Sequence, residues 1–217
     1  MSLNVSTKVE KNSCLPVGLV ILAAGASTRL GRPKQLLMVD ECSLLRRAIE
    51  SALASVCQPI AVVLGAFATR LIEELIDLPA YVVINPHWEK GMSSSIRIGI
   101  DALEAGLKIE AAIIMLCDQP FVTAEIIDDL VAAYRATGRQ IVASEYGGTL
   151  GAPALFGRPL FADLKMLEEA EGAKKVINEH ASQVLRIPFA QGAIDIDTPM
   201  DYARFLAMTG KQVEEAG

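Results

Sequence analysis

The sequence predicts an α/β protein of three layers, a Rossmann-like fold in which helices cover both faces of a mostly parallel sheet. Short apolar runs alternate along the chain with longer amphipathic stretches. The runs lack the alternation of polar and apolar residues that a half-exposed strand shows, so we expect both of their faces to be buried. A repeated strand–helix order of this kind is typical of α/β domains.

The predicted elements follow one another in that order up to about residue 145. The strands are the runs Val17–Ala23, Ile60–Leu64, Tyr81–Ile84, Ala111–Leu116 and Gln140–Ala143. The helices between them are Ser43–Ser55, Ala68–Ile76, Ser93–Ala105 and Thr123–Thr137. Within the third helix Ile96, Ile100 and Leu103 share one side. The fourth begins with Thr123 as a cap and ends before Gly138.

The order of elements changes in the last third of the chain. The segment GGTLGAPALF is predicted to be a turn that leads into a strand. After it we expect helices around Pro159–Leu167 and Gly172–His180, strands at Val184–Pro188 and Ala193–Ile196, and a closing helix at Pro199–Met208 that starts after Thr198. We expect one domain over residues 16–210, with a flexible tail at 1–15 and a second tail at 211–217.

Composition restricts the class of protein. The chain has 217 residues, 52% of them hydrophobic and 21% charged, with a net charge of -6. This is a globular composition, and the absence of a Lys/Arg cluster argues against a nucleic-acid binder. The longest apolar run, Val17–Ala24, is too short to cross a membrane, and the N-terminus lacks the apolar centre of a signal peptide. We therefore expect a cytoplasmic protein whose cysteines are reduced thiols, Cys14, Cys42, Cys57 and Cys117.

The segment LAAGASTRLGRPKQLL, residues 22–37, follows the first strand and is the strongest candidate for a ligand site. In a parallel sheet ligands bind at the carboxyl ends of the strands. Gly25 allows close approach of the backbone, and free amides in such a turn form a nest for anions. Arg29 and Lys34 add charge-assisted bonds to phosphate oxygens. The simpler interpretation, an ordinary turn with surface cations, does not account for this combination.

Two known phosphate motifs are absent from this segment. A Walker A loop requires Lys-Ser/Thr after its last glycine, whereas Arg32 and Pro33 follow Gly31 here. The dinucleotide fingerprint requires two glycines one residue apart, and Ala24 and Ala26 flank Gly25 instead. The loop therefore belongs to another class of phosphate site.

Three further segments carry candidate site residues. GMSSSIRIGI follows the third strand and offers Ser94, Ser95 and Arg97 at the start of a helix, either as ligand contacts or as a simple cap. LCDQP ends the fourth strand with Asp118, a carboxylate that would hold a divalent cation beside bound phosphate. In DIDTPMDY, Asp195 and Asp197 alternate on an extended segment and point to one face. Either of them could complete a metal site, and we favour Asp197.

The loop resembles the LAAGxSxRxGxPKxLL signature of the MobA-like NTP transferases, and the GMSSSxRxG and DIDTP segments are also similar to that family. The chain looks most like its molybdenum cofactor cytidylyltransferases. The resemblance spans roughly residues 17–207 and implies the fold of the nucleotide-diphospho-sugar transferases. It also implies that the loop wraps the triphosphate of CTP, because relatives with Ala-Ala-Gly at residues 23–25 tend to use pyrimidines.

The resemblance assigns a role to each motif residue. Catalysis is implied for Lys34, Arg29 and Asp118. Nucleotide binding is implied for Leu22, Ala23, Ala24, Gly25, Ser27, Arg29, Gly31, Lys34, Ser94, Ser95 and Arg97. Binding of Mg²⁺ is implied for Asp118, with Asp197 or Asp195.

The implied reaction is attack by a phosphate oxygen of the acceptor on the α-phosphorus of CTP, with release of pyrophosphate. The implied acceptor is molybdopterin or its molybdenum-bearing form, and the product would pass to a molybdoenzyme or its chaperone. Three departures from the family pattern leave that acceptor open: Ala152 replaces a frequent His, Glu169-Ala170 replaces Gly-Asp, and Lys174 replaces Arg. The alternatives are a transferase for a sugar- or polyol-phosphate and a non-catalytic chaperone that binds the cofactor.

Overall fold

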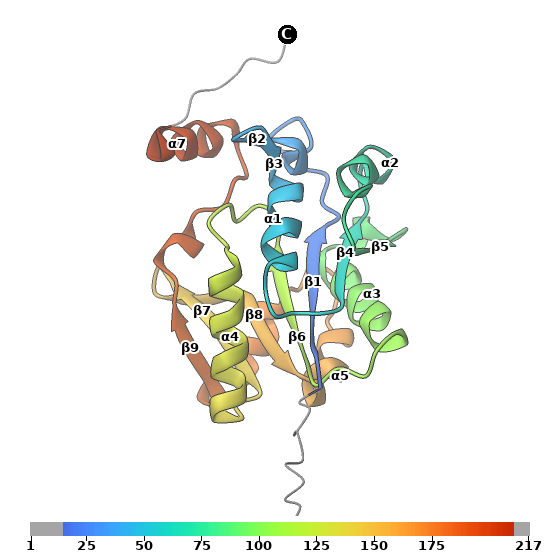
Figure 1. Cartoon of the computed structure of the whole chain (residues 1–217), viewed down its shortest axis with the longest axis vertical. Helices are drawn as coiled ribbons and strands as arrows, with labels where there is room; N and C mark the ends of the chain where they lie inside the picture. Colours follow the sequence, from blue (N-terminus) through green and yellow to red (C-terminus); the bar gives the residue numbers. More distant parts are fainter. Residues whose placement is uncertain (1–14, 211–217) are drawn as a thin grey trace, which may run out of the picture.

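The central sheet has seven strands in the order β5-β4-β1-β6-β8-β7-β9. It is seen in a computed structural model that describes residues 15–210, and Figure 1 shows it with helices on both sides. The strands are β1 (Val17–Ala23), β4 (Ile60–Leu64), β5 (Tyr81–Ile84), β6 (Ala111–Leu116), β7 (Ile141–Tyr146), β8 (Thr149–Gly157) and β9 (Val184–Pro188). The three-layer α/β prediction is confirmed. Except for Leu15, the two expected tails lie outside the described residues.

β1 occupies a central position and pairs in parallel with β4 on one side and β6 on the other. Ala23 lies opposite Leu64, and Leu22 lies opposite Leu116, so the three strands end at the same edge. All seven residues of β1 are buried, as expected for a strand covered on both faces. This register places the loop after β1 beside the segment after β6.

The side chains of β1 alternate between two hydrophobic clusters. Leu19 and Ile21 belong to a cluster that includes buried residues of α1 (Leu44–Leu53) and α4 (Ala124–Thr137). Val20 and Leu22 belong to the opposite cluster, which includes α3 (Met92–Ala105), α5 (Phe161–Lys165) and α6 (Ala173–Glu179). The predicted stripe of α3 is confirmed, because Ile96, Ile100 and Leu103 are all buried there.

The sheet is not parallel throughout. β8 runs antiparallel to both β6 and β7, whereas β9 returns parallel to β7. Only Gly147 and Gly148 connect β7 to β8, with positive φ angles of 55° and 74°. A two-residue connection can join antiparallel strands only, which explains this reversal within an otherwise parallel sheet.

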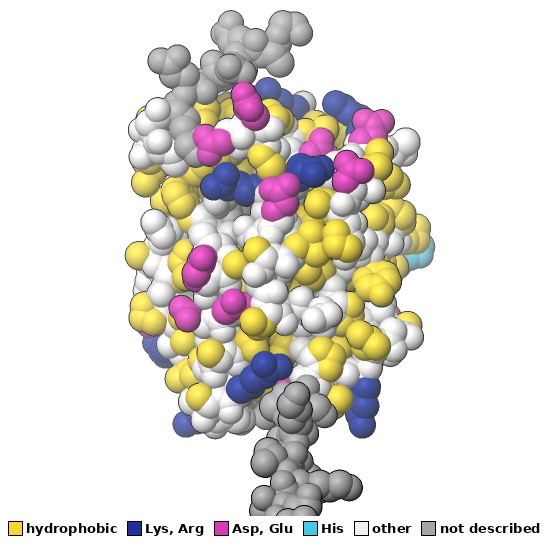
Figure 2. Space-filling model, in the orientation of Figure 1, with side chains coloured by type: hydrophobic (Ala, Val, Ile, Leu, Met, Phe, Trp, Pro, Cys, Tyr) yellow, Lys and Arg dark blue, Asp and Glu magenta, His cyan; other side chains and the backbone are white. Residues whose placement is uncertain are grey.

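The edge strand β5 corrects the expectation that every strand would be buried on both faces. Tyr81 is 65% exposed, and Val82 and Ile84 are also exposed. Apolar side chains are visible at the right-hand edge of Figure 2, where β5 lies in Figure 1. An apolar run of four residues does not distinguish a central strand from an edge strand, because position in the sheet is decided by pairing.

Several predicted boundaries also change. The helix expected at Ala68–Ile76 is α2 (Ala68–Leu71) followed by a 3-10 turn at Ile72–Leu75. The helix expected at Pro159–Leu167 is a 3-10 turn at Arg158–Leu160 followed by α5. The strand predicted at Ala193–Ile196 was wrong: Ala190–Ala193 form a 3-10 turn, and the chain then runs on without a ladder partner. Short segments of this kind are decided by tertiary contacts rather than by local pattern.

A third hydrophobic cluster holds the C-terminal segment against the loop region after β1. It joins Leu37 and the small hairpin of β2 (Met38–Val39) and β3 (Cys42–Ser43) to Ile196 and α7 (Pro199–Thr209). The Tyr202 hydroxyl donates to the Met38 carbonyl at 2.6 Å, and the Ile196 amide donates to the Asp118 carbonyl at 3.2 Å. These contacts bring the DIDTP segment to the ends of β1 and β6.

None of the helices within residues 15–210 has the length and apolar composition needed to cross a bilayer. On the face shown in Figure 2, basic and acidic side chains are interspersed.

Candidate active site

A cavity of about 210 Å³ opens where β1 and β6 end. From the loop after β1 it is lined by Leu22, Ala23, Ala24, Gly25, Lys34 and Gln35, and from β6 by Leu116, Cys117 and Asp118. Trp88, Gly91, Met92 and Ser95 close the third side. The position is the carboxyl edge of the sheet, where the sequence predicted a site.

The loop after β1 is held in a fixed turn. Ser27 has a positive φ of 54°, and its carbonyl accepts from the amides of Leu30 and Gly31 at 3.0 and 3.2 Å. Its side-chain oxygen accepts from the Lys34 amide at 3.1 Å. Within the described part of the chain, no group accepts a hydrogen bond from the backbone amides of residues 24–29. Six successive N–H groups are therefore free to donate to an anion, as the amides of a nest do.

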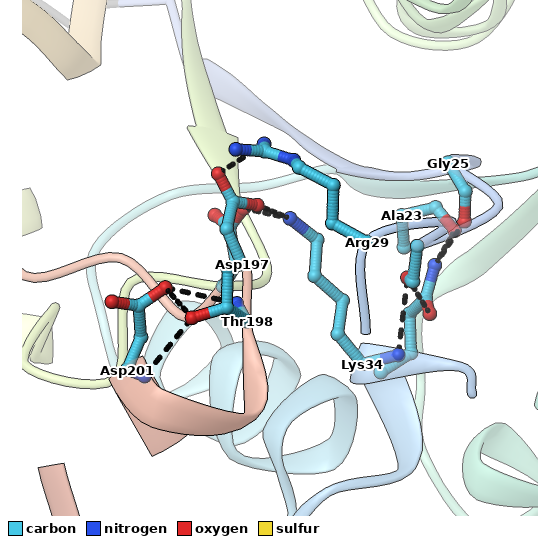
Figure 3. A network of polar contacts seen from close by, with 10 residues as sticks. Ala23, Gly25, Arg29, Lys34, Asp197, Thr198 and Asp201 are labelled. Atoms are coloured by element: carbon cyan, nitrogen blue, oxygen red, sulfur yellow. Dashed lines mark hydrogen bonds and ion pairs between the residues drawn. The ribbon is translucent and has the colours of Figure 1, made fainter. Parts of the chain in front are cut away.

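Lys34 brings together charged residues from three distant parts of the sequence. Its ammonium group contacts Asp118 at the end of β6 and lies 2.7 Å from Asp197 Oδ1. Arg29 contacts the other oxygen of Asp197 at 2.5 Å. Figure 3 shows Arg29 and Lys34 reaching from the loop toward Asp197. The two cations and two carboxylates form one cluster, of which Lys34 and Asp118 line the cavity.

The surroundings of this cluster shift the pKa values of its members. Burial works against the charged form of Lys34, but the charge and hydrogen bond of Asp118 outweigh it and raise the pKa of the ammonium. Burial likewise opposes ionisation of Asp197, yet its bonds to Lys34 and the charges of Lys34 and Arg29 lower the pKa of that carboxyl. Lys34 and Asp197 are therefore both charged at neutral pH.

Asp195 has a different environment although it lies two residues away. Partial burial and the negative charges of Asp197 and Asp118 raise the pKa of its carboxyl. Its side chain makes no hydrogen bond or ion pair with the described residues. Of the two aspartates of the DIDTP segment, Asp197 is therefore the one in contact with Lys34.

The carboxylates also fit a hard divalent cation. Asp118 is 8% exposed, and its Oδ1 is a buried acceptor with no partner among the described residues. Its other oxygen and Asp197 already hold a cationic group, the ammonium of Lys34. No cluster of three acidic, histidine or cysteine side chains suited to a metal occurs within residues 15–210. Two carboxylates are sufficient for Mg²⁺ or Mn²⁺, which take their remaining ligands from water and substrate phosphates.

The serine-rich start of α3 is organised by Asn85, which is buried at the end of β5. The Asn85 amide donates to the hydroxyls of Ser94 and Ser95 at 2.8 and 3.0 Å. Ser95 lines the cavity described above, whereas Ser94 and Arg97 line a separate shallow hollow with residues 166–169. Arg97 donates to the carbonyls of Lys165 and Leu167. The structure thus separates Arg97 from the cluster around Lys34.

A second cavity, of about 280 Å³, adjoins the first and shares Met92 and Leu116 with it. Its lining contains three of the four residues at which the chain departs from the family pattern, Ala152, Ala170 and Lys174, whereas Glu169 lines the shallow hollow beside Arg97. Most of the other lining side chains are apolar. Lys174 is the cation in this lining.

Gln35 and Trp88 are among the residues of the first cavity that the sequence prediction of the site did not name. Gln35 is a polar residue directly before the apolar Leu36 and Leu37, and this contrast is a signal that could have identified it. Trp88 is the single tryptophan of the chain, and no signal beyond that marks it. Cys117 also lines the cavity, but it is buried, and burial raises the pKa of its thiol to about 12, so no thiolate forms there at neutral pH to act as a nucleophile.

Comparison with known proteins identifies related sequences. The family described as the MobA-like NTP transferase domain matches residues 19–184. Nicotine blue oxidoreductase of Paenarthrobacter nicotinovorans is 33% identical over 147 residues, which is 66% of this chain and 69% of that protein. The molybdenum cofactor cytidylyltransferase of Escherichia coli K12 is 24% identical over 187 residues, or 86% of this chain and 93% of that protein.

Solved structures share the fold. A homologue of Rv0371c from Mycobacterium sp. strain JC1 is 32% identical, with a TM-score of 0.76 over 89% of this chain and 96% of that one. The manganese complex of Rv0371c from Mycobacterium tuberculosis H37Rv is 25% identical, with a TM-score of 0.75 over 88% of this chain and 98% of that one.

Proposed function

The chain belongs to the MobA-like NTP transferase domain family, and we propose that it is a nucleotidyltransferase that moves CMP from CTP to the terminal phosphate of molybdopterin or its molybdenum-bearing form. Pyrophosphate is the second product. One observation carries the proposal: the start of the loop with free amides, Ala24 and Gly25, lines the same cavity as Lys34 and Asp118, and Lys34 also contacts Asp197. Groups that bind phosphate and groups that bind a divalent cation are both present there.

The reaction joins two anions, so its main barrier is charge repulsion and alignment. An oxygen of the acceptor phosphate forms a bond to the α-phosphorus of the nucleotide, and the bond from that phosphorus to the bridging oxygen of the β-phosphate breaks. Lys34 and Arg29 neutralise charge on the triphosphate and on the departing pyrophosphate. The amides of the loop orient the phosphates, and no side chain of the protein acts as a nucleophile.

Asp118 and Asp197 would hold a divalent metal ion, with Mg²⁺ as the proposed one and the manganese complex of the related Rv0371c as support for a divalent ion. When bound, such an ion supplies Lewis-acid stabilisation of charge on phosphate oxygens. Lys34 contacts both carboxylates in the structure, so it must exchange them for phosphate oxygens when the nucleotide arrives with its metal.

The choice of CTP and of a molybdopterin acceptor rests on family resemblance. Ala24 lines the cavity, as expected for a residue of the base-binding loop. The adjoining cavity around Ala152, Ala170 and Lys174 would receive the acceptor. We infer a cytoplasmic location and delivery of the product to a molybdoenzyme or its chaperone.

Three other functions remain candidates for test. A sugar- or polyol-phosphate acceptor is suggested by the altered residues of the second cavity, and a chaperone would bind the cofactor without turnover. An oxidoreductase is suggested by the name of one relative. The Lys34–Asp118–Asp197 cluster favours phosphoryl chemistry over all non-transferase functions, because neither electron transfer nor simple binding requires paired carboxylates beside a phosphate nest.

Pyrophosphate release separates these functions. Purified protein is incubated with Mg²⁺, each of CTP, GTP, ATP and UTP, and either molybdopterin or a panel of sugar phosphates. We expect release with CTP and molybdopterin, and at least a 100-fold loss in Lys34→Ala and Asp118→Ala. Release of pyrophosphate with sugar phosphates alone would show that the acceptor is a sugar phosphate and not molybdopterin. No release with any pair, or unchanged rates in both variants, would refute the transferase mechanism.

A further inference from the structure

Gln35 is an almost completely buried glutamine, 1% exposed, in the short 3-10 turn Lys34–Leu36. Its side-chain amide donates to the carbonyls of Ala23 and Gly25, both at 2.9 Å. Its own carbonyl oxygen accepts from the Ser27 hydroxyl at 3.4 Å. One side chain thus ties together the end of β1 and the turn that follows it.

These bonds account for the orientation of the loop backbone. The Ala24 carbonyl, between the two that Gln35 holds, accepts from the Ala66 amide at 2.9 Å. Three successive carbonyl oxygens are therefore engaged by protein donors, while the amides of residues 24–29 have no acceptor among the described residues. A peptide group points its C=O and N–H in opposite directions. Holding the carbonyls directs the amides of the following residues away from Gln35.

The burial of a glutamine at this position also requires a physical explanation. Burial of an amide is unfavourable unless its hydrogen bonds are made, and the next two residues, Leu36 and Leu37, are apolar. An apolar side chain at residue 35 would leave the Ala23 and Gly25 carbonyls without the donor they now have. Each free carbonyl would present partial negative charge near the phosphates.

We propose that Gln35 is a positioning residue for the nucleotide: it fixes the peptide groups from Ala23 to Gly25 so that the loop presents donors, and no acceptors, to the triphosphate. The proposal rests on the nucleotide site proposed above. The proposal adds Gln35 to the site as a residue that contacts the loop backbone and not the reacting atoms.

The chain contains a matched control. Gln119 is also buried, and its side-chain amide also donates to two backbone carbonyls, those of Ala152 and Gly192, at 3.0 and 3.1 Å. Ala152 lines the second cavity, not the first. Replacement of either glutamine by methionine removes two comparable amide-to-carbonyl hydrogen bonds and keeps the length of the side chain; Gln35→Met also removes the longer bond from the Ser27 hydroxyl.

The experiment measures binding of CTP with Mg²⁺, and of pyrophosphate with Mg²⁺, by isothermal titration calorimetry in wild type, Gln35→Met and Gln119→Met. We expect Gln35→Met to weaken both ligands by at least about tenfold, as misplaced binding groups do, and Gln119→Met to leave both within about threefold. Thermal unfolding without ligand should show similar losses for the two variants. A positioning role predicts the difference in affinity, which a purely structural role does not.

Each outcome has a defined meaning. Equal affinity in Gln35→Met and wild type, or equal losses in the two variants, overturns the proposal. If Gln35→Met does not fold, Gln35→Asn is used, because it keeps the amide but is too short to reach both carbonyls, and wild-type affinity there overturns the proposal as well. Failure of the wild type to bind any nucleoside triphosphate or pyrophosphate would instead refute the proposed function.

Discussion

Replacement of Lys34 by methionine removes the positive charge that lies between Asp118 and Asp197. The methionine has nearly the same length, so packing is largely kept while the charge is lost. Asp118 is 8% exposed, and one of its oxygens already lacks a partner, so its charge would have no compensation in the variant. Asp197 keeps its contact with Arg29.

The size of the effect follows from burial. Removal of one partner from a buried ion pair costs about 3–5 kcal/mol, because a buried charge is left alone. We expect the lower end, about 3 kcal/mol, because Arg29 still compensates Asp197. In a protein of this size each kcal/mol lowers the Tm by about 2–4 °C, so the Tm should fall by about 6–12 °C.

Differential scanning calorimetry at pH 7 measures this loss. Because the pKa of Lys34 is raised in the folded state, its contribution is complete below its unfolded pKa of about 10.5 and is lost as the pH rises further. Because the pKa of Asp197 is lowered, its contribution is present above its unfolded value of about 3.9 and is lost as the pH falls below it. Neutral pH therefore lies within the window in which Lys34 and Asp197 both contribute fully.

Lys165→Met is the matched control. Lys165 also bridges two carboxylates, Asp101 at 3.1 Å and Glu104 at 2.8 Å, but all three side chains lie at the surface. Exposed pairs contribute about 0–1 kcal/mol, so the control should lower the Tm by no more than about 4 °C. Addition of Asp118→Asn to Lys34→Met should restore part of the lost stability. Equal losses in Lys34→Met and Lys165→Met, or no recovery in the double variant, would refute the argument from burial.

Three further outcomes are expected. Mn²⁺ alone should bind weakly to the protein, because Lys34 occupies both carboxylates. CTP should raise the affinity of the protein for Mn²⁺ by at least about tenfold in a paramagnetic resonance titration. Equal affinity for Mn²⁺ with and without CTP would contradict this coupling. Asp197→Asn should lower the rate of pyrophosphate release by about 100-fold and Asp195→Asn by no more than about threefold, and the reverse order would exchange their roles. Thr198→Val should lower the free energy of unfolding by about 1 kcal/mol in a urea titration, because the Thr198 hydroxyl accepts from the Asp201 amide in a capping box at the start of α7. An unchanged midpoint of urea unfolding would show that this cap contributes nothing to stability.

Local features were predictable from the sequence because they depend on neighbours in the chain. Gly138 ends α4 with a positive φ of 67°, and Thr198 begins α7, both as predicted from residue type alone. Thr123 occupies the predicted N-cap position of α4, although its side chain makes no capping hydrogen bond. The motif of residues 22–37 likewise predicted a phosphate loop, because its glycines and cations lie within ten residues of one another, and phosphate binding there stays a prediction.

Other features depended on strand pairing and could not be predicted. The reversal at β8 and the exposed edge at β5 follow from which strands pair, and apolar runs of similar composition do not specify this. The failure of the strand predicted at Ala193–Ile196 has the same cause. A short apolar stretch forms a strand only where a ladder partner is present.

The candidate residues could be named from the sequence, because glycine-rich turns, cations and carboxylates at strand ends have recognisable chemistry. Their arrangement could not, because Lys34 is 84 positions from Asp118 and 163 positions from Asp197. The pairing of β1 with β6 and the packing of α7 against the hairpin bring these three side chains into contact. Gln35 is likewise buried only in the folded chain, where its side-chain amide donates to the carbonyls of Ala23 and Gly25. Sequence determines which groups a chain carries, but the direction in which a peptide carbonyl or a distant carboxylate points is set by contacts that exist only after folding.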